Sequence, residues 1–251
     1  MLTKRIKQYL KNFRWELGQE QIENMLIAQQ IIDTNTKSFE RYKNMYQGEK
    51  VAVVATGPTL AQYVPEGDII YVGVNKAYKS DKLKLDYLFC QDYLNGTPRE
   101  IMDEIGKLDC IKFYGKFKSP KDIQIPESLI VEHGANPYYV DDCPPTLKIY
   151  EDICHHPLMN CFSVAFSALQ FAIFTNPAEL YLIGCDCSST GYFYDKSKST
   201  SIMDKHLHDM YEGYVRFKEF ATKMYPDTRI ISINPVGLKG IFEDRYIKEK
   251  K

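Results

Sequence analysis

The pattern of apolar and polar positions divides the chain into two parts. Residues 1–47 contain no proline and one glycine, and their aliphatic and aromatic side chains recur at the spacing of one helical face. The residues of this face are Leu2, Ile6, Tyr9, Leu10 and Phe13, with lysines and arginines around it. We therefore expect a helical extension over residues 1–47 that ends near Gly48.

From Lys50 onwards, short β-compatible runs alternate with helical stretches. The expected strands are Val51–Ala55, Ile69–Val74, Tyr87–Cys90, Cys110–Tyr114, Leu129–Glu132, Leu180–Ile183 and Arg229–Ile233. The expected helices are Pro98–Lys107, Cys161–Phe174 and 209–223. This alternation is typical of an α/β fold with a mostly parallel sheet and helices on both faces. We expect residues 48–251 to form one such domain.

Small and polar residues directly follow several of these strands. They are Gly57-Pro58-Thr59, Asn75, Gln91-Asp92 and Gly184-Cys185-Asp186. In a sheet of this kind, ligands bind beyond the carboxyl ends of the strands. The sequence therefore predicts a binding site at this edge of the sheet.

Two interpretations of the turn after the first strand stay open. Gly57 lets a ligand approach the backbone, and Pro58 suits the first position of a helix whose free N–H groups attract an anion. The turn lacks the Gly-Lys-Ser/Thr of a Walker loop and the three glycines of the dinucleotide fingerprint. The alternative is a tight strand-to-helix turn without a ligand. Under the first interpretation, Gly57→Val weakens nucleotide binding and leaves the fold intact.

Composition narrows the classes of function. The 32 basic and 33 acidic residues give a net charge of −1, which argues against general binding of nucleic acid. The seven cysteines are an odd number and predict no disulfide framework. Because we find neither a secretory signal nor a membrane span in the sequence, we expect a cytoplasmic protein. Its basic amphipathic helix suits packing on the domain or a partner chain, or peripheral contact with the inner face of the cell membrane.

Metal-binding side chains occur without metal-binding spacing. Cys154-His155-His156 and Cys185-Asp186-Cys187 lack a second pair at the spacing of a zinc site. The Asp-x-Asp triplet that diphosphate-dependent sugar transferases use for their metal does not occur. We therefore expect no metal and no cofactor, and phosphate charge neutralised by hydroxyls, amides and helix dipoles.

Residues 187–208 have the composition of a mobile lid, rich in serine, threonine, glycine and tyrosine. His206 and His208 lie at its end, and a histidine there can remove a proton near neutral pH. We prefer His208, because it stands nearer the helix that carries Tyr211, Tyr214 and Phe217; His206 is the rival.

Taken in order, these motifs resemble the bacterial sialyltransferases of glycosyltransferase family forty-two, and they are similar to motility-accessory-factor sugar-transferase domains. The segments that carry the resemblance are ATGPTL, YVGVNKAY, LDYLFCQDY, FSVAFSALQFAIFTNPAELYLIGCD and INPVGLKGIFE, within residues 50–243. The resemblance implies a Rossmann-like, modified single-domain nucleotide-sugar transferase fold. It implies inverting, metal-independent transfer of a sialic or related nonulosonic acid from a CMP-activated donor to a glycan hydroxyl. Such transfer builds bacterial surface polysaccharide or lipooligosaccharide.

The resemblance also implies roles for individual residues. The nucleotide-binding positions are Thr56, Gly57, Pro58, Thr59, Asn75, Gln91, Ser163 and Asp186. Tyr192 matches a lid tyrosine that donates to the leaving phosphate, and His208 matches the general base. The resemblance and the helical extension together favour a homo-oligomer.

The chain departs from the family pattern at several of these positions. Thr56 replaces an asparagine of the first turn, and Ser188 and Lys205 replace tyrosines near the lid. An arginine ahead of Ser163 is missing. Two alternatives therefore stay open: a pterin-type diphosphokinase, which needs magnesium, and a non-catalytic glycan-assembly protein that keeps only the nucleotide pocket.

Overall fold

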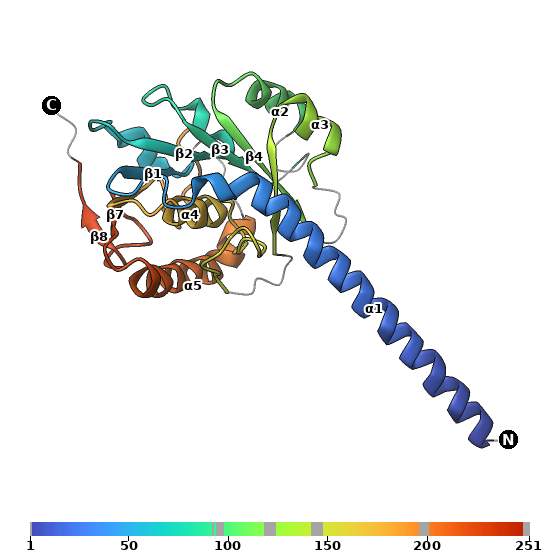
Figure 1. The fold of residues 1–251 in the computed structure, drawn as a ribbon. Coiled ribbons are helices and arrows are strands. Elements are labelled where there is room, and N and C mark those ends of the chain that lie inside the picture. Colours follow the sequence, from blue (N-terminus) through green and yellow to red (C-terminus); the bar gives the residue numbers. More distant parts are fainter. Residues whose placement is uncertain are drawn as a thin grey trace.

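The computed structural model describes residues 2–91, 93, 98–117, 124–141, 148–195 and 201–247. Its centre is one sheet of eight strands, all parallel, in the order β5-β4-β3-β2-β1-β6-β7-β8 (Figure 1). The strands are β1 Lys50–Val54, β2 Ile70–Val74, β3 Tyr87–Cys90, β4 Ile111–Phe117, β5 Asn136–Val140, β6 Glu179–Ile183, β7 Arg229–Ile233 and β8 Glu243–Arg245. This architecture confirms the expected α/β, Rossmann-like fold.

The strand order reverses direction at β1. The chain adds β2, β3, β4 and β5 on one side of β1 and then returns to place β6 on its other side. The pairing register sets Val54 beside both Gly73 of β2 and Ile183 of β6, so the three carboxyl ends lie at one level. Such a reversal is where ligands bind in open parallel sheets.

Helices cover both faces of the sheet. The last turns of α1 (Leu2–Phe39), α4 (Ala165–Phe174) and α5 (Ser201–Met224) lie on one face (Figure 1). The short 3₁₀ helices η2 (Pro58–Gln62) and η3 (Asn75–Lys79) and the helices α2 (Arg99–Gly106) and α3 (Glu127–Glu132) lie on the other. Alternate residues of a strand point to opposite faces of the sheet. Val51 and Val53 pack against the layer of α1, α4 and α5, whereas Ala52 and Val54 pack against the layer of η2, η3, α2 and α3.

The helical extension is partly integral to the domain. From Ile31 onwards α1 packs against the β5 side of the sheet, and Asn35 accepts a hydrogen bond of 2.8 Å from the Tyr139 amide. Phe39 stacks on Phe113 with ring centroids 5.3 Å apart, and Tyr42 of the following 3₁₀ turn η1 (Glu40–Tyr42) is also buried. The first part of α1 projects from the body as a stalk (Figure 1). None of the helices in the described ranges combines the length and apolarity needed to cross a membrane.

The two parts of α1 are expected to respond differently to truncation. Deleting residues 1–26 removes exposed or half-buried side chains among those described, so the body stays folded. Deleting residues 1–47 also removes Phe39 and Tyr42, and losing one buried aromatic side chain typically costs about 3–5 kcal/mol. We expect a much lower melting temperature for the longer deletion only, measured by circular dichroism. Equal melting curves for the two deletions would contradict this division of the helix.

Three local expectations about secondary structure are corrected by the structure. Leu129–Glu132, expected as a strand, belongs to α3, where Leu129 and Ile130 are buried while Val131 is exposed. A short apolar run does not distinguish strand from helix by itself. The predicted helix at Cys161–Phe174 begins only at Ala165, and the one at 209–223 begins earlier, at Ser201. The edge strands β5 and β8 were not expected.

Candidate functional site

A small cavity of about 70 Å³ lies at the strand reversal, beyond the carboxyl ends of β1 and β6. It is lined by Ala55, Thr56, Gly57, Ser163, Ala165, Gly184, Cys185, Asp186, Cys187, Ser188, Gly191, Tyr192, Met210 and Tyr214. Five of these lining residues, Thr56, Ser163, Ser188, Tyr192 and Tyr214, carry hydroxyl groups. The cavity thus brings together the turn after β1, the turn after β6, the turn before α4 and the start of the predicted lid.

The turn after β1 is held tightly by the turn after β6. The Gly57 amide donates to the Gly184 carbonyl at 2.9 Å. A Cβ added at Gly57 would lie 2.5 Å from that carbonyl oxygen and 2.5 Å from Asp186 Oδ2. The space that a side chain at Gly57 would enter is therefore filled by the protein, which corrects the expectation that such a side chain would take the place of a ligand; Gly57 itself lines the cavity, and its nucleotide-binding role stays a prediction.

Asp186 and Thr59 are hydrogen-bonded to each other across these two turns. The Thr59 amide donates to Asp186 Oδ2 at 3.0 Å, and the Thr59 hydroxyl donates to Oδ1. Asp186 is buried, and this burial raises the pKa of its carboxyl group although the two bonds from Thr59 oppose the shift. The two hydrogen bonds between Thr59 and Asp186 thus join the turn after β1 to the turn after β6 and position this part of the cavity wall.

The expectation that free N–H groups after Pro58 bind an anion is also corrected. Pro58 begins η2, a 3₁₀ helix of five residues, and it has no N–H of its own. The next two amides are used within the protein, because Thr59 donates to Asp186 and Leu60 donates to the Gly57 carbonyl at 3.1 Å. The start of η2 therefore offers little to an anion.

Asn75 and Gln91 have different surroundings. Gln91 is buried, and its amide nitrogen donates to Ser167 Oγ at 2.7 Å and to the Tyr138 hydroxyl at 3.2 Å. These bonds fix the core between β3, β5 and α4, so Gln91 acts as a packing residue here. Asn75 directly follows β2 with a φ of 46°, and its buried Oδ1 has no hydrogen-bond partner among the described residues. A buried acceptor without a partner is uncommon and suits a bound donor group.

The start of the predicted lid forms a small hairpin against the first turn. The Tyr192 and Asp195 backbones exchange two hydrogen bonds of 3.1 Å, and the Phe193 amide donates to the Thr56 carbonyl at 3.0 Å. The Tyr192 and Tyr194 rings stack with centroids 5.2 Å apart, and Lys76 Nζ lies 5.7 Å from the Tyr194 ring centre. This hairpin brings Tyr192 to the cavity, while its role as a donor to a leaving phosphate stays a prediction. Residues 196–200 of the lid lie outside the described residues.

The two histidines lie on different faces of α5. Met210 and Tyr214, one helical turn apart, line the cavity, and His206 stands one turn before Met210 on the same face. The His206 ring stacks on Phe162 with centroids 3.7 Å apart, and its Nδ1 lies 3.5 Å from Asp209 Oδ2. His208 is exposed and two residues away from both His206 and Met210, so it faces away from the cavity. The structure thus places His206, and not His208, on the cavity face of α5, while the role of either histidine as a base stays a prediction.

The two metal-like sequence clusters have other contacts. His156 stacks on Tyr150 at 3.9 Å, and His155 Nδ1 lies 2.9 Å from Asp152 Oδ2. Burial raises the pKa of the Cys154 and Cys185 thiols to about 12 and that of Cys187 to about 11. These thiols stay protonated near neutral pH and pack as small apolar groups.

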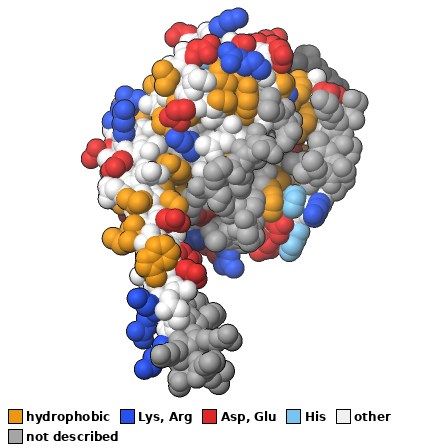
Figure 2. All heavy atoms as spheres, turned by 90° about the vertical axis from the view of Figure 1, so that its right-hand side faces the viewer, with side chains coloured by type: hydrophobic (Ala, Val, Ile, Leu, Met, Phe, Trp, Pro, Cys, Tyr) orange, Lys and Arg blue, Asp and Glu red, His pale blue; other side chains and the backbone are white. Residues whose placement is uncertain are grey.

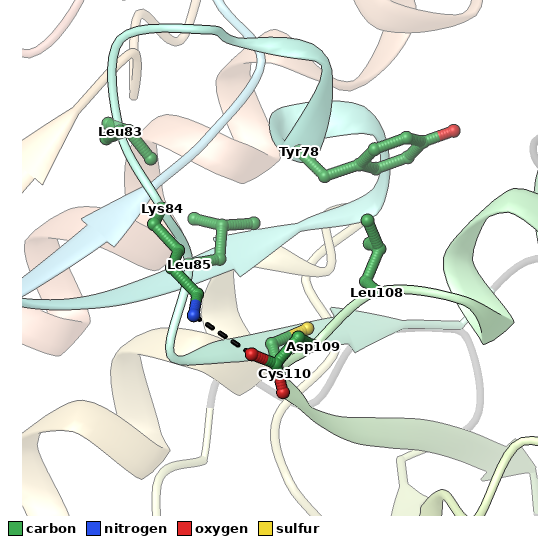
Figure 3. Close-up of a pocket in the computed structure, with 7 residues that line it drawn as sticks. All are labelled: Tyr78, Leu83, Lys84, Leu85, Leu108, Asp109 and Cys110. Carbon is green, nitrogen blue, oxygen red and sulfur yellow. Dashed lines mark hydrogen bonds and ion pairs between the residues drawn. The ribbon is translucent and has the colours of Figure 1, made fainter.

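A roomier pocket of about 320 Å³ lies elsewhere, beside the segments that lead into β3 and β4 (Figure 3). Its walls are Tyr78, Leu83, Lys84, Leu85, Leu108, Asp109 and Cys110. The charged pair at its rim, Lys84 Nζ and Asp109 Oδ2 at 3.0 Å, is exposed to solvent. This pocket lies at the amino ends of β3 and β4, away from the strand reversal, and Tyr78 brings it one hydroxyl group, which donates to Glu104.

One ionic cluster that was not expected from the sequence lies where α2 meets the end of α3. Atoms of Asp103, Glu132 and His133 come within 4.8 Å of one another. Arg99 already binds both carboxylates, with Nε 2.7 Å from Asp103 Oδ1 and Nη2 3.3 Å from Glu132 Oε2. His133 Nδ1 lies 2.8 Å from the Tyr114 hydroxyl. The cluster is therefore a network of ion pairs and hydrogen bonds that joins two helices.

The sequence matches no family model, and its comparison with curated proteins gives no match.

Proposed function

We propose that the chain is an inverting glycosyltransferase that moves a sialic or related nonulosonic acid from a CMP-activated donor to a glycan hydroxyl. The observation that supports this most is the cavity at the strand reversal, whose lining includes Thr56, Ser163 and the hairpin residue Tyr192. We place the reaction in the cytoplasm, at the inner face of the cell membrane, where bacterial surface polysaccharide or lipooligosaccharide is built.

The wall of the cavity suits a departing monophosphate. As the bond between sugar and CMP breaks, negative charge grows on one phosphate group, and fixed hydrogen-bond donors stabilise that charge. Thr56, Ser163 and Tyr192 line the cavity, and their hydroxyl groups can serve as such donors. In this proposal these hydroxyl groups replace the backbone N–H groups after Pro58 that the sequence predicts as phosphate donors.

The nucleotide needs more room than the cavity has. Ligand pockets commonly measure about 300–1,000 Å³, whereas this cavity measures about 70 Å³. A backbone hydrogen bond from the Phe193 amide to the Thr56 carbonyl ties the hairpin around Tyr192 to the first turn. We propose that it shifts when the donor enters, and that Asn75, at the same sheet edge, accepts a hydrogen bond from the nucleotide through its unpartnered Oδ1.

His206 is our candidate for the general base. The acceptor hydroxyl has to lose its proton as it attacks the sugar, and a histidine is suited to this near neutral pH. His206 lies on the cavity face of α5 and is held by Phe162 and Asp209. The acceptor then approaches between Ser163, which follows Phe162, and the lid hairpin.

A pterin-type diphosphokinase has weaker support from these residues. That reaction uses clustered carboxylates to hold magnesium at the phosphates. Among the described residues that line the cavity, Asp186 is the one carboxyl group, and it is bonded to Thr59.

Calorimetry tests the proposal most directly. We expect the protein to bind CMP in preference to UDP, GDP and ATP, with the same affinity with and without magnesium. Tyr192→Phe is expected to weaken CMP binding, while Tyr194→Phe, its neighbour in the stack, serves as the matched control. A magnesium-dependent preference for ATP would favour the diphosphokinase. Binding of CMP without any release of CMP from CMP-N-acetylneuraminate would favour a non-catalytic role.

A further inference from the structure

The stalk of α1 exposes large apolar side chains to solvent. Trp15 is 67% exposed, Ile22 52%, Met25 72% and Leu26 60%. Their spacing of three, four and seven residues places them on one face of the helix. Figure 2 shows apolar side chains gathered on the stalk next to the body, with a row of lysine and arginine side chains beyond them.

A helix of this kind needs a partner. All described side chains between Lys7 and Gln30 are exposed or half-buried, so the body gives this part of α1 little support. Gly18 lies in its middle, and a glycine inside a helix costs about 1 kcal/mol relative to alanine. Most helices in proteins owe their stability to packing of an apolar face rather than to helix propensity.

Charge along the helix selects the orientation of that partner. Lys7, Lys11 and Arg14 lie on the same face as the exposed apolar side chains, towards the tip of the stalk. Asp33 lies on this face at the base, where it is exposed. Two parallel copies would place the basic tips against each other, whereas two antiparallel copies place Lys7 at the basic tip of each helix against Asp33 of the other.

We infer that two copies of the chain associate through antiparallel pairing of their α1 helices, centred near Glu20. In this register Trp15 of one copy meets Met25 of the other, and an aromatic ring against a thioether is a favourable contact. Gly18 meets Ile22, so the smallest side chain faces a large one. Lys7 meets Asp33, which forms an ion pair at each end of the interface.

The length of the stalk separates the two bodies. At 1.5 Å per residue, the helix between Lys7 and Asp33 is roughly 40 Å long. Antiparallel pairing therefore places the two bodies at opposite ends of the paired helices. An anionic membrane surface is the rival partner for a basic helix, but Asp33 on the same face would be repelled by it.

The single tryptophan of the chain allows a direct test. We expect the full-length protein to have twice the monomer mass in sedimentation analysis, and the Trp15 emission to shift to shorter wavelength as protein concentration rises. Met25→Glu is expected to weaken association at least tenfold, because it places a charge in the contact with Trp15. Val131→Glu, at a residue 76% exposed on the body, is the matched control and should leave association unchanged.

A charge exchange tests the antiparallel register. Lys7→Glu and Asp33→Lys are each expected to weaken association about tenfold, since two symmetry-related pairs become repulsive, and the double variant is expected to restore it. Failure of the double variant to recover would overturn the register. A monomer at all concentrations would overturn the inference, as would a Trp15 emission shift that appears only on adding phosphatidylserine vesicles.

Discussion

His206→Ala is expected to lower the rate of sugar transfer by roughly 10²–10⁴-fold, the usual contribution of a general base. The base acts in the transition state, so the affinity for CMP should change little. The measurement is CMP release from CMP-N-acetylneuraminate with a mixture of oligosaccharide acceptors, beside calorimetry with CMP. His208→Ala is the matched control, because His208 is exposed on the other side of α5 and should keep near-normal activity.

The stacking of His206 on Phe162 requires a second variant. His206→Phe keeps an aromatic ring beside Phe162, whose ring centroid lies 3.7 Å from that of His206, but it removes both ring nitrogens. If His206 is the base, His206→Phe loses activity as His206→Ala does. Recovery of activity in His206→Phe would assign His206 a packing role. Loss of activity in His208→Ala with normal activity in His206→Ala would return the base to His208.

The centre of the sheet could be predicted from the sequence, and its edges could not. Central strands such as Tyr87–Cys90 are buried on both faces, so they appear as continuous apolar runs. The edge strand β5 contains Pro137, which lowers the strand signal although an edge position tolerates it. The other edge strand, β8, consists of Glu243, Asp244 and Arg245, whose composition indicates a loop.

The location of the site could be predicted, but its internal contacts could not. Turns after parallel strands gather at one edge, and this rule brought Thr56, Asn75 and Asp186 to one region. The bond between Thr59 and Asp186 joins residues 127 positions apart, and no local pattern indicates it. The choice between His206 and His208 depended on which face of α5 turns towards the cavity. Met210 and Tyr214, which line the cavity, identify that face.

Gly57→Val is expected to destabilise the protein, by about 3 kcal/mol, because overpacking of a tight contact typically costs about 1–3 kcal/mol and occasionally more. The new Cβ would lie 2.5 Å from the Gly184 carbonyl oxygen, which belongs to the backbone and cannot rotate away. Gly184 has a φ of 65°, so moving this turn also disturbs a conformation that favours glycine. Asp186 cannot move without breaking its two bonds to Thr59.

Urea unfolding followed by circular dichroism measures this cost. Gly18→Ala is the control, since its added Cβ meets nothing within 4 Å and it should not destabilise the body. The effect on ligand binding separates the two interpretations of the turn. If Gly57 positions the cavity wall, the Gly57→Val protein loses stability first, and its CMP binding falls with the folded fraction. Wild-type stability together with lost CMP binding would show instead that a ligand occupies the space beside Gly57, with the contact to Gly184 relieved by a shift of the turn.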